Sequence, residues 1–383
     1  MLELRAISAP AELPAVRGGW EELLGRAPAA NLFLTFEWLT TWWRHYGGNA
    51  RLCLLGVYEG GELSGLAPLM IQERRLTGIP IYRSVSFLGT GISDRLDILL
   101  TAGRERAILE TIVSHLRSQQ WDMVDLQEIP EDSVTVKLLP ELAEPLGAQV
   151  EVMPQSVCPV IKLKETPEAQ FATLGKKLRR NIGAYGRRLK REHAVVVDFV
   201  KDGPAPTDDL QAFFRLYRKC FADRPSARQL IGDQFAAFRQ EIATRFATQG
   251  RLLLALLRID GTLAAGGLAF LYRGTCYWYN TCYDPAWQRE SIGTLLHWEI
   301  MRHAITVGCH EFDYLRGDEA FKAHWGAQPR RHVRIRITRE TPKLRVLRAG
   351  VHLARLRGRL VPTAWMRQSQ RLRRPTVGEG IPQ

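Results

Sequence analysis

The sequence lacks any apolar run long enough for a membrane-spanning helix. No stretch of about eighteen or more consecutive apolar positions occurs in its 383 residues. The first residues, MLELRAISAPAELP, include Glu3 and Glu12 and contain no apolar segment of the secretory type. We therefore expect a cytoplasmic protein without a membrane span or a secretory signal.

Paired cysteines and common metal-binding motifs are also missing. None of the six cysteines belongs to a C-x-x-C pair, and no H-E-x-x-H motif occurs. Scattered cysteines in a chain without a secretory signal are typical of reduced cytoplasmic thiols. The triplet Cys309-His310-Glu311 is interpreted as a turn before a strand, because no further ligands stand at a suitable spacing. No metal is expected.

Acidic residues are absent from one part of the chain. Residues 343–374 contain ten Lys or Arg and no Asp or Glu. The whole chain has a net charge of +13, so subtracting these ten leaves only +3 for all other residues. A nearly neutral body argues against general nucleic-acid binding, because the basic character belongs to the tail.

The sequence does contain enough apolar residues for two packed domains. It is 45% hydrophobic and 24% charged, which is typical of a globular chain. Segments 51–70 and 251–271 each place two apolar runs around a glycine-containing turn, which predicts a β-hairpin. Each hairpin is followed by a further strand, by an amphipathic helix at 103–119 or 291–307, and by a last strand.

This repeated order of hairpin, strand, helix and strand predicts a duplicated domain. The last strands, at 121–129 and 310–317, carry Asp125 and Asp313 at matching positions. Such units form mixed, mostly antiparallel sheets flanked by helices, in the α/β (α+β) class. We expect a first domain at 1–155, a second domain at 156–340 and a basic tail at 341–383.

The helix at 291–307 begins with small residues, in the pattern Gln288-x-x-Ser291-x-Gly293. A helix N-terminus presents unpaired N–H groups and the positive end of the helix dipole. Small residues at this point let a phosphate group approach the backbone closely. An ordinary helix start with Ser291 as the N-cap explains the same letters equally well.

Ionisable residues gather after the last strand, in FDYLRGDEAFKAHWG. Arg316, Asp318 and Glu319 follow the strand directly, and Lys322 stands three residues after Glu319. A carboxylate at the carboxyl end of a strand can accept a proton from an amine nucleophile. The alternative is a solvated turn in which Glu319 and Lys322 form an ordinary surface pair.

Together with FEWLTTWWRHYG (36–47) and KKLRRNIGAYGRRLKRE (176–192), these segments resemble the CelD/BcsL family of Gcn5-related N-acetyltransferases, named for cellulose and exopolysaccharide loci. That family is distantly similar to the Fem aminoacyl transferases. The resemblance covers roughly residues 20–340 and implies two tandem acetyltransferase-like domains. It further implies that the first domain, whose matching helix lacks the phosphate pattern, has lost its cofactor site and shapes the acceptor cleft.

The resemblance implies acetyl-CoA or another acyl-CoA as the donor. Pantetheine would run along the strand at 277–281, and the pyrophosphate would lie at 291–294. The cofactor-binding residues implied by this placement are Tyr279, Asn280, Thr281, Gln288, Arg289, Ser291, Ile292, Gly293 and Thr294.

An amine of the acceptor, or in second place a hydroxyl, would attack the thioester directly. Glu319 or Asp318 is the expected base. Lys322 and Arg316 would orient the acceptor or offset developing charge. Tyr283 would protonate the leaving thiolate. The expected acceptor is a small molecule or a glycan-related compound of the envelope or of a polysaccharide.

Two basic elements leave other partners open. Residues 176–191 form an amphipathic helix with eight Lys or Arg, which we interpret as a solvated face over a core stripe. The alternatives are a phosphorylated or acidic acceptor, the 3′-phosphate of coenzyme A, or tRNA, as in a Fem-like aminoacyl-tRNA-dependent transferase.

The tail at 343–374 predicts peripheral binding to an anionic membrane on its cytoplasmic face, or a docking helix. A non-catalytic binding protein in polysaccharide assembly is the last alternative.

Overall fold

The chain divides into two compact units. A computed structural model describes residues 1–76, 79–200, 207–222, 232–339 and 341. Within these residues, unit 1 comprises 1–156 and the strand residues from 331 onward, and unit 2 comprises 157–330. The division expected at residue 155 lies next to the first of these boundaries, but the chain returns to unit 1 at residue 331.

Unit 1 is a sheet with the strand order β1-β2-β3-β4-β6-β13 and β7 beside β13. The pair β4–β6 is parallel, and the pairs β1–β2, β2–β3, β3–β4 and β6–β13 are antiparallel. Its strands are β1 (Leu2–Ile7), β2 (Arg51–Glu59), β3 (Glu62–Leu76), β4 (Ile79–Phe87), β6 (Met123–Pro130), β7 (Ala148–Lys162) and β13 (Gln328–Arg339), with the short β5 (Leu99–Leu100) on β3. Its helices are α1 (Leu13–Arg26), α2 (Phe36–Tyr46), α3 (Glu105–Ser118) and α4 (Val134–Leu142).

Unit 2 is a second sheet segment with the order β12-β11-β10-β9-β8 and the end of β7 beside β12. Among its strand pairs in the described residues, β11–β12 is parallel and the others are antiparallel. Its strands are β8 (Val195–Val200), β9 (Leu252–Ile259), β10 (Thr262–Tyr272), β11 (Thr275–Tyr283) and β12 (Glu311–Asp313). Its helices are α5 (Pro167–Thr173), α6 (Lys176–Glu192), α7 (Thr207–Phe221), α8 (Asp233–Ala247), the 3-10 turn η5 (Pro285–Glu290), α9 (Ile292–Thr306) and α10 (Ala320–His324).

The two units repeat one order of elements, as the sequence predicts. The order β2-β3-β4-α3-β6 of unit 1 corresponds to β9-β10-β11-α9-β12 of unit 2. In both units, the third strand of this order pairs in parallel with the last strand. The final residue pair of this ladder is Ser86 with Asp125 in unit 1 and Tyr277 with Asp313 in unit 2. The matching positions of Asp125 and Asp313 are therefore confirmed in three dimensions.

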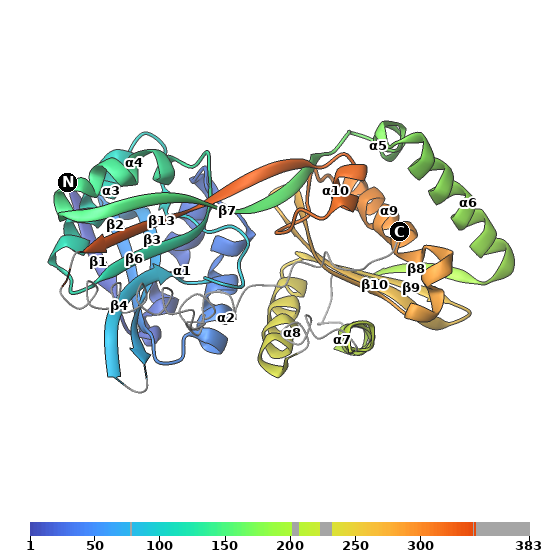
Figure 1. Ribbon diagram of the computed structural model, residues 1–383, viewed down its shortest axis with the longest axis horizontal. Coiled ribbons are helices and arrows are strands. Elements are labelled where there is room, and N and C mark those ends of the chain that lie inside the picture. The colour runs from blue at the N-terminus through green and yellow to red at the C-terminus, as the bar shows by residue number, and fades with distance from the viewer. Residues whose placement is uncertain (77–78, 201–206, 223–231, 340, 342–383) are drawn as a thin grey trace, which may run out of the picture. The chain divides into compact units, whose positions relative to one another are not determined.

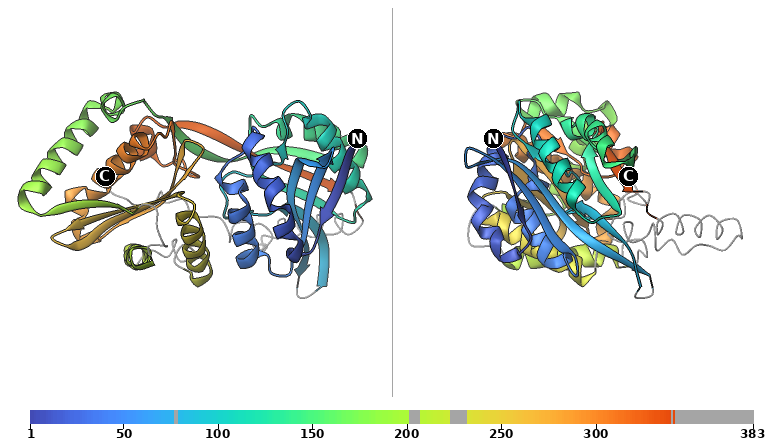
Figure 2. Two further views of the ribbon diagram at one scale, coloured as in Figure 1. Left: turned by 180° about the vertical axis from the view of Figure 1, so that it is seen from behind. Right: turned by 90° about the vertical axis from the view of Figure 1, so that its left-hand side faces the viewer.

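A glycine in the second strand lets the crossover helix pack closely in each unit. A β-carbon built on Gly65 would lie 2.2 Å from Cγ2 of Ile108 in α3, and one built on Gly267 would lie 2.3 Å from Cδ1 of Ile300 in α9. The neighbouring Gly266 faces α7 instead, because its β-carbon would lie 2.6 Å from the Phe213 ring. Helices α9 and α7 therefore cover opposite faces of the sheet of unit 2 (Figure 1), and the views in Figure 2 show helices on both faces of unit 1 as well.

We expect Gly65→Ala to destabilise unit 1 by about 1–3 kcal/mol, because the added methyl group overpacks the α3 contact. Ile108 is fully buried and β-branched, so a change of its χ1 rotamer to make room is restricted. Urea unfolding would measure the effect. The matched control is Gly18→Ala in α1, where nothing lies within 4 Å and a gain of about 0.5–1 kcal/mol is expected. Equal stability of Gly65→Ala and the wild type would contradict the packing argument.

The basic tail expected at 343–374 lies outside the described residues. Within the part of the chain that is described, no helix combines the length and apolar character needed to cross a bilayer.

Candidate active site in unit 2

The edge of β11 opens where its partner β12 ends. The two strands pair only between 275–277 and 311–313, whereas β11 continues to Tyr283. A β-bulge at Tyr279 interrupts the register between β10 and β11 and bends the strand at this point. The backbone groups of 278–283 on this side therefore lie outside the β11–β12 ladder, where an extended ligand can pair with them.

The side chains along this edge have a role different from that of the backbone. Tyr279 and Asn280 are buried, and the Asn280 amide donates to the hydroxyl of Tyr217 in α7 at 3.3 Å. Thr281 is half-buried. Of the three residues that the sequence assigns to the pantetheine, Asn280 thus has its side chain turned toward α7, so its contribution to a donor site would come from the backbone.

Helix α9 begins without a capping side chain. Ser291 has φ +51° in the left-handed region, and its side chain makes no cap hydrogen bond. Its carbonyl accepts from the N–H groups of Thr294 and Leu295 at 3.0 and 3.3 Å. The ordinary interpretation, with Ser291 as a side-chain N-cap, is therefore wrong. The first turn also contains no acidic residue, so its backbone N–H groups and the helix dipole favour an anion.

The end of β11 meets this first turn. A β-carbon built on Gly293 would lie 3.4 Å from Cδ1 of Tyr283, which is an ordinary van der Waals contact. Gln288 and Arg289 are exposed on η5, whereas Ile292 is fully buried and points into the core. The structure thus brings Tyr283 next to the start of α9. Among the cofactor-binding residues predicted at 288–294, Ile292 is the one whose side chain is buried in the core.

The corresponding helix of unit 1 starts differently. Helix α3 has Glu105 in its first turn, and its N-cap residue Arg104 forms an ion pair with Glu59. A carboxylate at this position repels a phosphate group. The start of α3 is therefore less favourable for an anion than the start of α9.

The segment after β12 is a tight turn rather than the strand continuation expected to residue 317. The Asp313 carboxylate accepts from the N–H of Leu315 at 2.8 Å, and Leu315 has φ +59°. The strand prediction for 310–317 is therefore too long, because this turn ends β12 at Asp313. Gly317 has φ +123°, and a β-carbon there would lie 2.5 Å from the Glu319 carboxylate, so only glycine fits.

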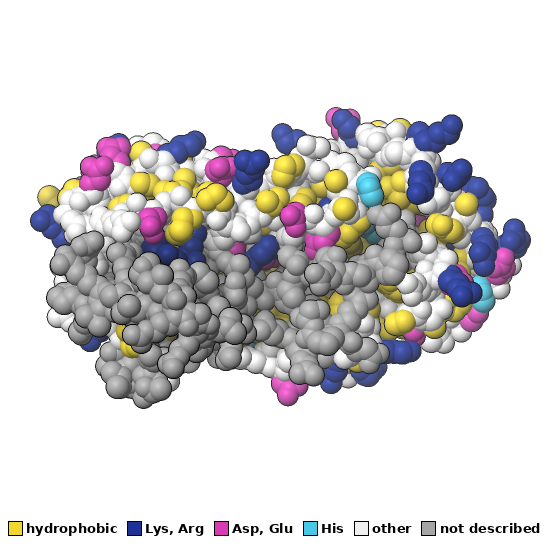
Figure 3. Space-filling model, in the orientation of Figure 1, with side chains coloured by type: hydrophobic (Ala, Val, Ile, Leu, Met, Phe, Trp, Pro, Cys, Tyr) yellow, Lys and Arg dark blue, Asp and Glu magenta, His cyan; other side chains and the backbone are white. Residues whose placement is uncertain are grey.

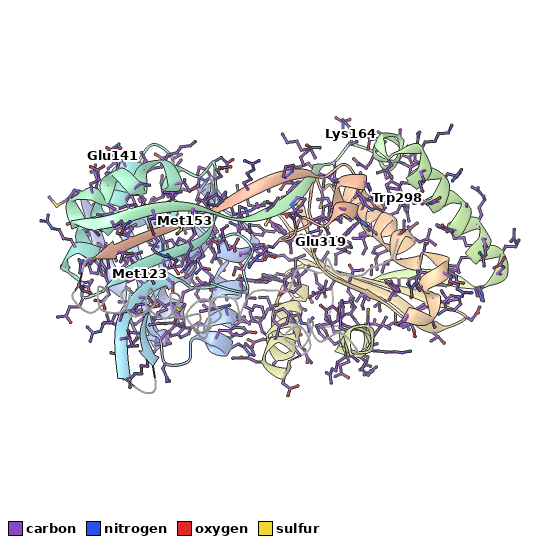
Figure 4. The ribbon with its side chains drawn as sticks, viewed as in Figure 1. Met123, Glu141, Met153, Lys164, Trp298 and Glu319 are labelled. Atoms are coloured by element: carbon purple, nitrogen blue, oxygen red, sulfur yellow. The ribbon has the colours of Figure 1, made fainter. Side chains whose placement is uncertain are left out.

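Lys322 holds this turn together from inside. Its ammonium group lies 2.7 Å from the Glu319 carboxylate and 2.9 Å from the Gly317 carbonyl, with longer contacts of 3.4 to 3.5 Å to the carbonyls of 314–316. Both charged side chains are almost fully buried, at 5% and 6% exposure. The interpretation of this pair as a solvated surface pair is therefore wrong. Glu319, labelled in Figure 4, comes from the turn that leads from β12 into α10.

The other predicted catalytic residues lie on the same turn or at the end of β11. Asp318 is exposed and Arg316 is half-buried, next to the Glu319–Lys322 pair along the chain. Tyr283 contacts Gly293 instead. Of the two predicted bases, Asp318 has a solvent-exposed carboxylate, whereas the Glu319 carboxylate forms a buried ion pair with Lys322.

A buried aromatic cluster next to β11 and β12 escaped the sequence analysis. The Tyr314 hydroxyl and Nε2 of His297 share a hydrogen bond of 2.8 Å. The His297 ring lies between Trp278 and Trp325, with ring centroids 4.3 and 3.9 Å away. Burial lowers the pKa of His297 to about 3 and raises the pKa of Tyr314 well above its ordinary value. The pair is therefore neutral at pH 7. The only signal in the sequence is a histidine on the apolar side of α9, in LLHW.

Three cysteines near the site are inert thiols. Burial raises the pKa of Cys276 and Cys282, both on β11, well above the ordinary range, and it raises the pKa of Cys309 to about 11. A thiol that stays protonated at pH 7 is a poor nucleophile. These residues therefore favour direct attack on a donor over an acyl-cysteine intermediate.

Comparison with known proteins identifies an acetyltransferase segment. Residues 176–323, from α6 to α10, match the family model described as an acetyltransferase (GNAT) domain. No curated protein sequence matches the chain. The chain therefore contains an acyltransferase domain of the GNAT type, as predicted. The narrower resemblance to the CelD/BcsL family stays a prediction.

Solved structures support the fold. The crystal structure of FemX is 11% identical with a TM-score of 0.63, covering 90% of this chain and 99% of that one. The C-terminal domain of a putative lysylphosphatidylglycerol synthetase from Agrobacterium fabrum is 13% identical with a TM-score of 0.54, covering 90% and 97%. L-PGS from Bacillus licheniformis is 14% identical with a TM-score of 0.50, covering 92% and 97%. At such identities the similarity concerns the fold, and it confirms the mixed α/β class with mostly antiparallel strands.

Proposed function

We propose that the chain transfers an acyl group, in the first place acetyl, from coenzyme A to an acceptor bound elsewhere on the protein. One observation carries the proposal. Within the segment that matches the acetyltransferase family, the open edge of β11 ends beside the uncapped first turn of α9, which the chain enters after η5. An extended pantetheine and a pyrophosphate need these two features in this order.

The donor contacts follow from the backbone. The outward N–H and C=O groups of 278–283 would pair with the amides of pantetheine, and the N–H groups of 292 and 293 would bind the pyrophosphate, since the N–H of Thr294 already donates to the Ser291 carbonyl. Exposed Gln288 and Arg289 on η5 would add polar contacts to the phosphates. The thioester supplies the activated acyl group, and the residues of the chain bind and orient it.

The proton transfers are assigned to two groups. As the acceptor amine forms its bond to the thioester carbonyl carbon, its proton passes to a carboxylate, for which exposed Asp318 is better placed than Glu319. The C–S bond then breaks, and the leaving thiolate takes a proton from water. Tyr283 lies beside Gly293 at the pyrophosphate end of the site, so it is too far from the sulfur for the role that the sequence assigned to it. The Glu319–Lys322 pair keeps the turn that carries Asp318 in place.

We expect Gly293→Glu to weaken acetyl-CoA binding by about 100-fold, because it adds bulk and negative charge at the proposed pyrophosphate site. Gly293→Ala is the matched control and should bind nearly as wild type, since its methyl group has 3.4 Å to the Tyr283 ring. Calorimetric titration measures both. Absence of binding to the wild type would refute the donor, and unchanged binding to Gly293→Glu would refute the site.

A second candidate is a Fem-like transferase that uses aminoacyl-tRNA. The basic helix α6 favours it, since eight of its 17 residues are Lys or Arg. Copurifying RNA and a steep loss of tRNA binding with salt would support this candidate. The acceptor class, envelope-related or polysaccharide-related, follows from the CelD/BcsL resemblance. A role for the tail at 343–374 at an anionic membrane surface rests instead on the basic and apolar residues of that segment. Turnover of any acyl-CoA would exclude a purely non-catalytic binding protein.

A further inference from the structure

Helix α6 carries positive charge that its surroundings do not neutralise. Arg188 and Arg191 contact Glu192, but no carboxylate among the described residues lies within 4.0 Å of the other basic side chains. These six are Lys176, Lys177, Arg179, Arg180, Arg187 and Lys190. Like charges three or four positions apart destabilise a helix, so the arrangement favours a bound anion.

The apolar side of α6 is already used within unit 2. Ile182 and Leu189 are buried in the core, and Gly186 packs against α9. The outward side is lined by Lys and Arg, which appear as dark-blue side chains where α6 lies in Figure 3. A helix that binds a membrane needs a free apolar face, which α6 does not have. Its exposed side therefore suits a phosphate ligand better than a bilayer.

The C-terminal half of α6 flanks the proposed pyrophosphate site. A β-carbon built on Gly186 would lie 3.7 Å from Cδ2 of Leu295, close to the first turn of α9. At the C-terminal end of α6, the ring centroid of His193 lies 5.1 Å from that of Trp287 in η5. The part of α6 between these two contacts thus runs beside the turn that begins α9.

Two of the six cations without a carboxylate partner lie in this stretch. Arg187 and Lys190 are exposed, and Arg289 is exposed on η5 itself. Gly183 leaves room for the Arg187 guanidinium, whose Nη1 would lie 3.2 Å from a β-carbon there. Arg187 and Lys190 stand three positions apart, which places both side chains on one side of the helix.

We propose that Arg187 and Lys190, together with Arg289, bind the 3′-phosphate on the ribose of coenzyme A. This inference rests on the proposed function, because it assumes a pyrophosphate at α9. The ribose phosphate belongs to the same nucleotide as the pyrophosphate, so it comes within reach of side chains that flank that turn. Charge-assisted contacts to a phosphate are among the strongest hydrogen bonds in proteins. The site therefore selects coenzyme A thioesters over donors that lack this phosphate.

The test compares acetyl-CoA with 3′-dephospho-acetyl-CoA by calorimetry on the full chain. We expect the wild type to prefer acetyl-CoA by about tenfold in Kd. Arg187→Gln/Lys190→Gln should lose this preference while it binds the dephosphorylated donor as wild type does. The matched control, Lys176→Gln/Lys177→Gln, removes the same charge about 14 Å or more from Gly186 along the same helix, at about 1.5 Å per residue. It should keep the preference.

Each result separates the inference from the proposed function. Equal affinity of the wild type for the two donors would overturn the inference and leave the donor site intact. An equal loss of preference in both double variants would also overturn it, because the preference would then come from the general positive field. Failure of the wild type to bind either donor would instead refute the proposed function.

Discussion

Replacement of Lys322 by methionine is expected to destabilise unit 2 by about 3–5 kcal/mol, because it leaves the buried Glu319 carboxylate without its cation. The same change removes the ammonium group that binds the carbonyls of the turn at 314–317. A solvated i,i+3 pair would contribute only about 0–1 kcal/mol. Urea unfolding of the variant therefore distinguishes a buried pair from a surface pair.

A double variant provides the control for this result. Glu319→Gln/Lys322→Met removes both charges, so it should recover a large part of the stability that Lys322→Met loses. The carbonyls of the turn stay without their donor in the double variant, and recovery should be incomplete for that reason. A loss of less than about 1 kcal/mol in Lys322→Met would show that the pair does not hold the turn.

Acidification is expected to destabilise unit 2 through His297. Burial lowers the pKa of His297 from 6.5 to about 3, so the unfolded chain binds a proton between these pH values and the folded chain does not. Stability is therefore full above about pH 6.5 and is lost as the pH falls toward 3. At about 1.4 kcal/mol per pH unit, the loss at pH 4.5 relative to pH 7 is about 3 kcal/mol.

The measurement compares the free energy of unfolding at pH 7 and pH 4.5 with that of a variant without the histidine. His297→Phe/Tyr314→Phe removes both members of the buried hydrogen bond, so no hydroxyl is left without its partner. Carboxylates contribute equally in both proteins, and the difference between the two slopes isolates His297. If both proteins lose the same stability on acidification, the histidine is not kept neutral by burial.

These two predictions concern the walls of the proposed donor site. Trp278, which follows the last β11–β12 pair, stacks on His297, and Tyr314 follows β12 directly. A protonated His297 would therefore disturb the place where the two strands separate. Acetyl-CoA binding should weaken in the same acidic range in which unit 2 loses stability.

Local patterns in the sequence were sufficient for most elements of the fold. The helices expected at 103–119 and 291–307 correspond to α3 and α9, and the hairpins at 51–70 and 251–271 correspond to β2–β3 and β9–β10. Hydrophobic periodicity and glycine turns act over a few residues, so they can be read without a structure. The duplicated order follows from the same local signals.

The sequence also indicated the segments of the candidate site, but not how their side chains are oriented. Gln288 lies on η5 and Gly293 in the first turn of α9, whereas Asn280 turns its amide toward α7. A strand alternates its side chains between two faces, and which face is buried depends on the helices that cover it. The β-bulge at Tyr279 changes this alternation locally, and no pattern of letters predicted it.

What only the tertiary structure decided is burial and long-range pairing. Glu319 and Lys322 have the same spacing in the sequence whether the pair is solvated or buried. Likewise, a histidine next to leucines, such as His297, can lie on the surface or in the core. Strand β13 pairs with β6, about two hundred residues earlier, although the sequence places it in the second domain. Such decisions depend on which distant surfaces meet when the chain folds. The free energy that settles them comes from apolar area removed from water, which no short segment contains by itself.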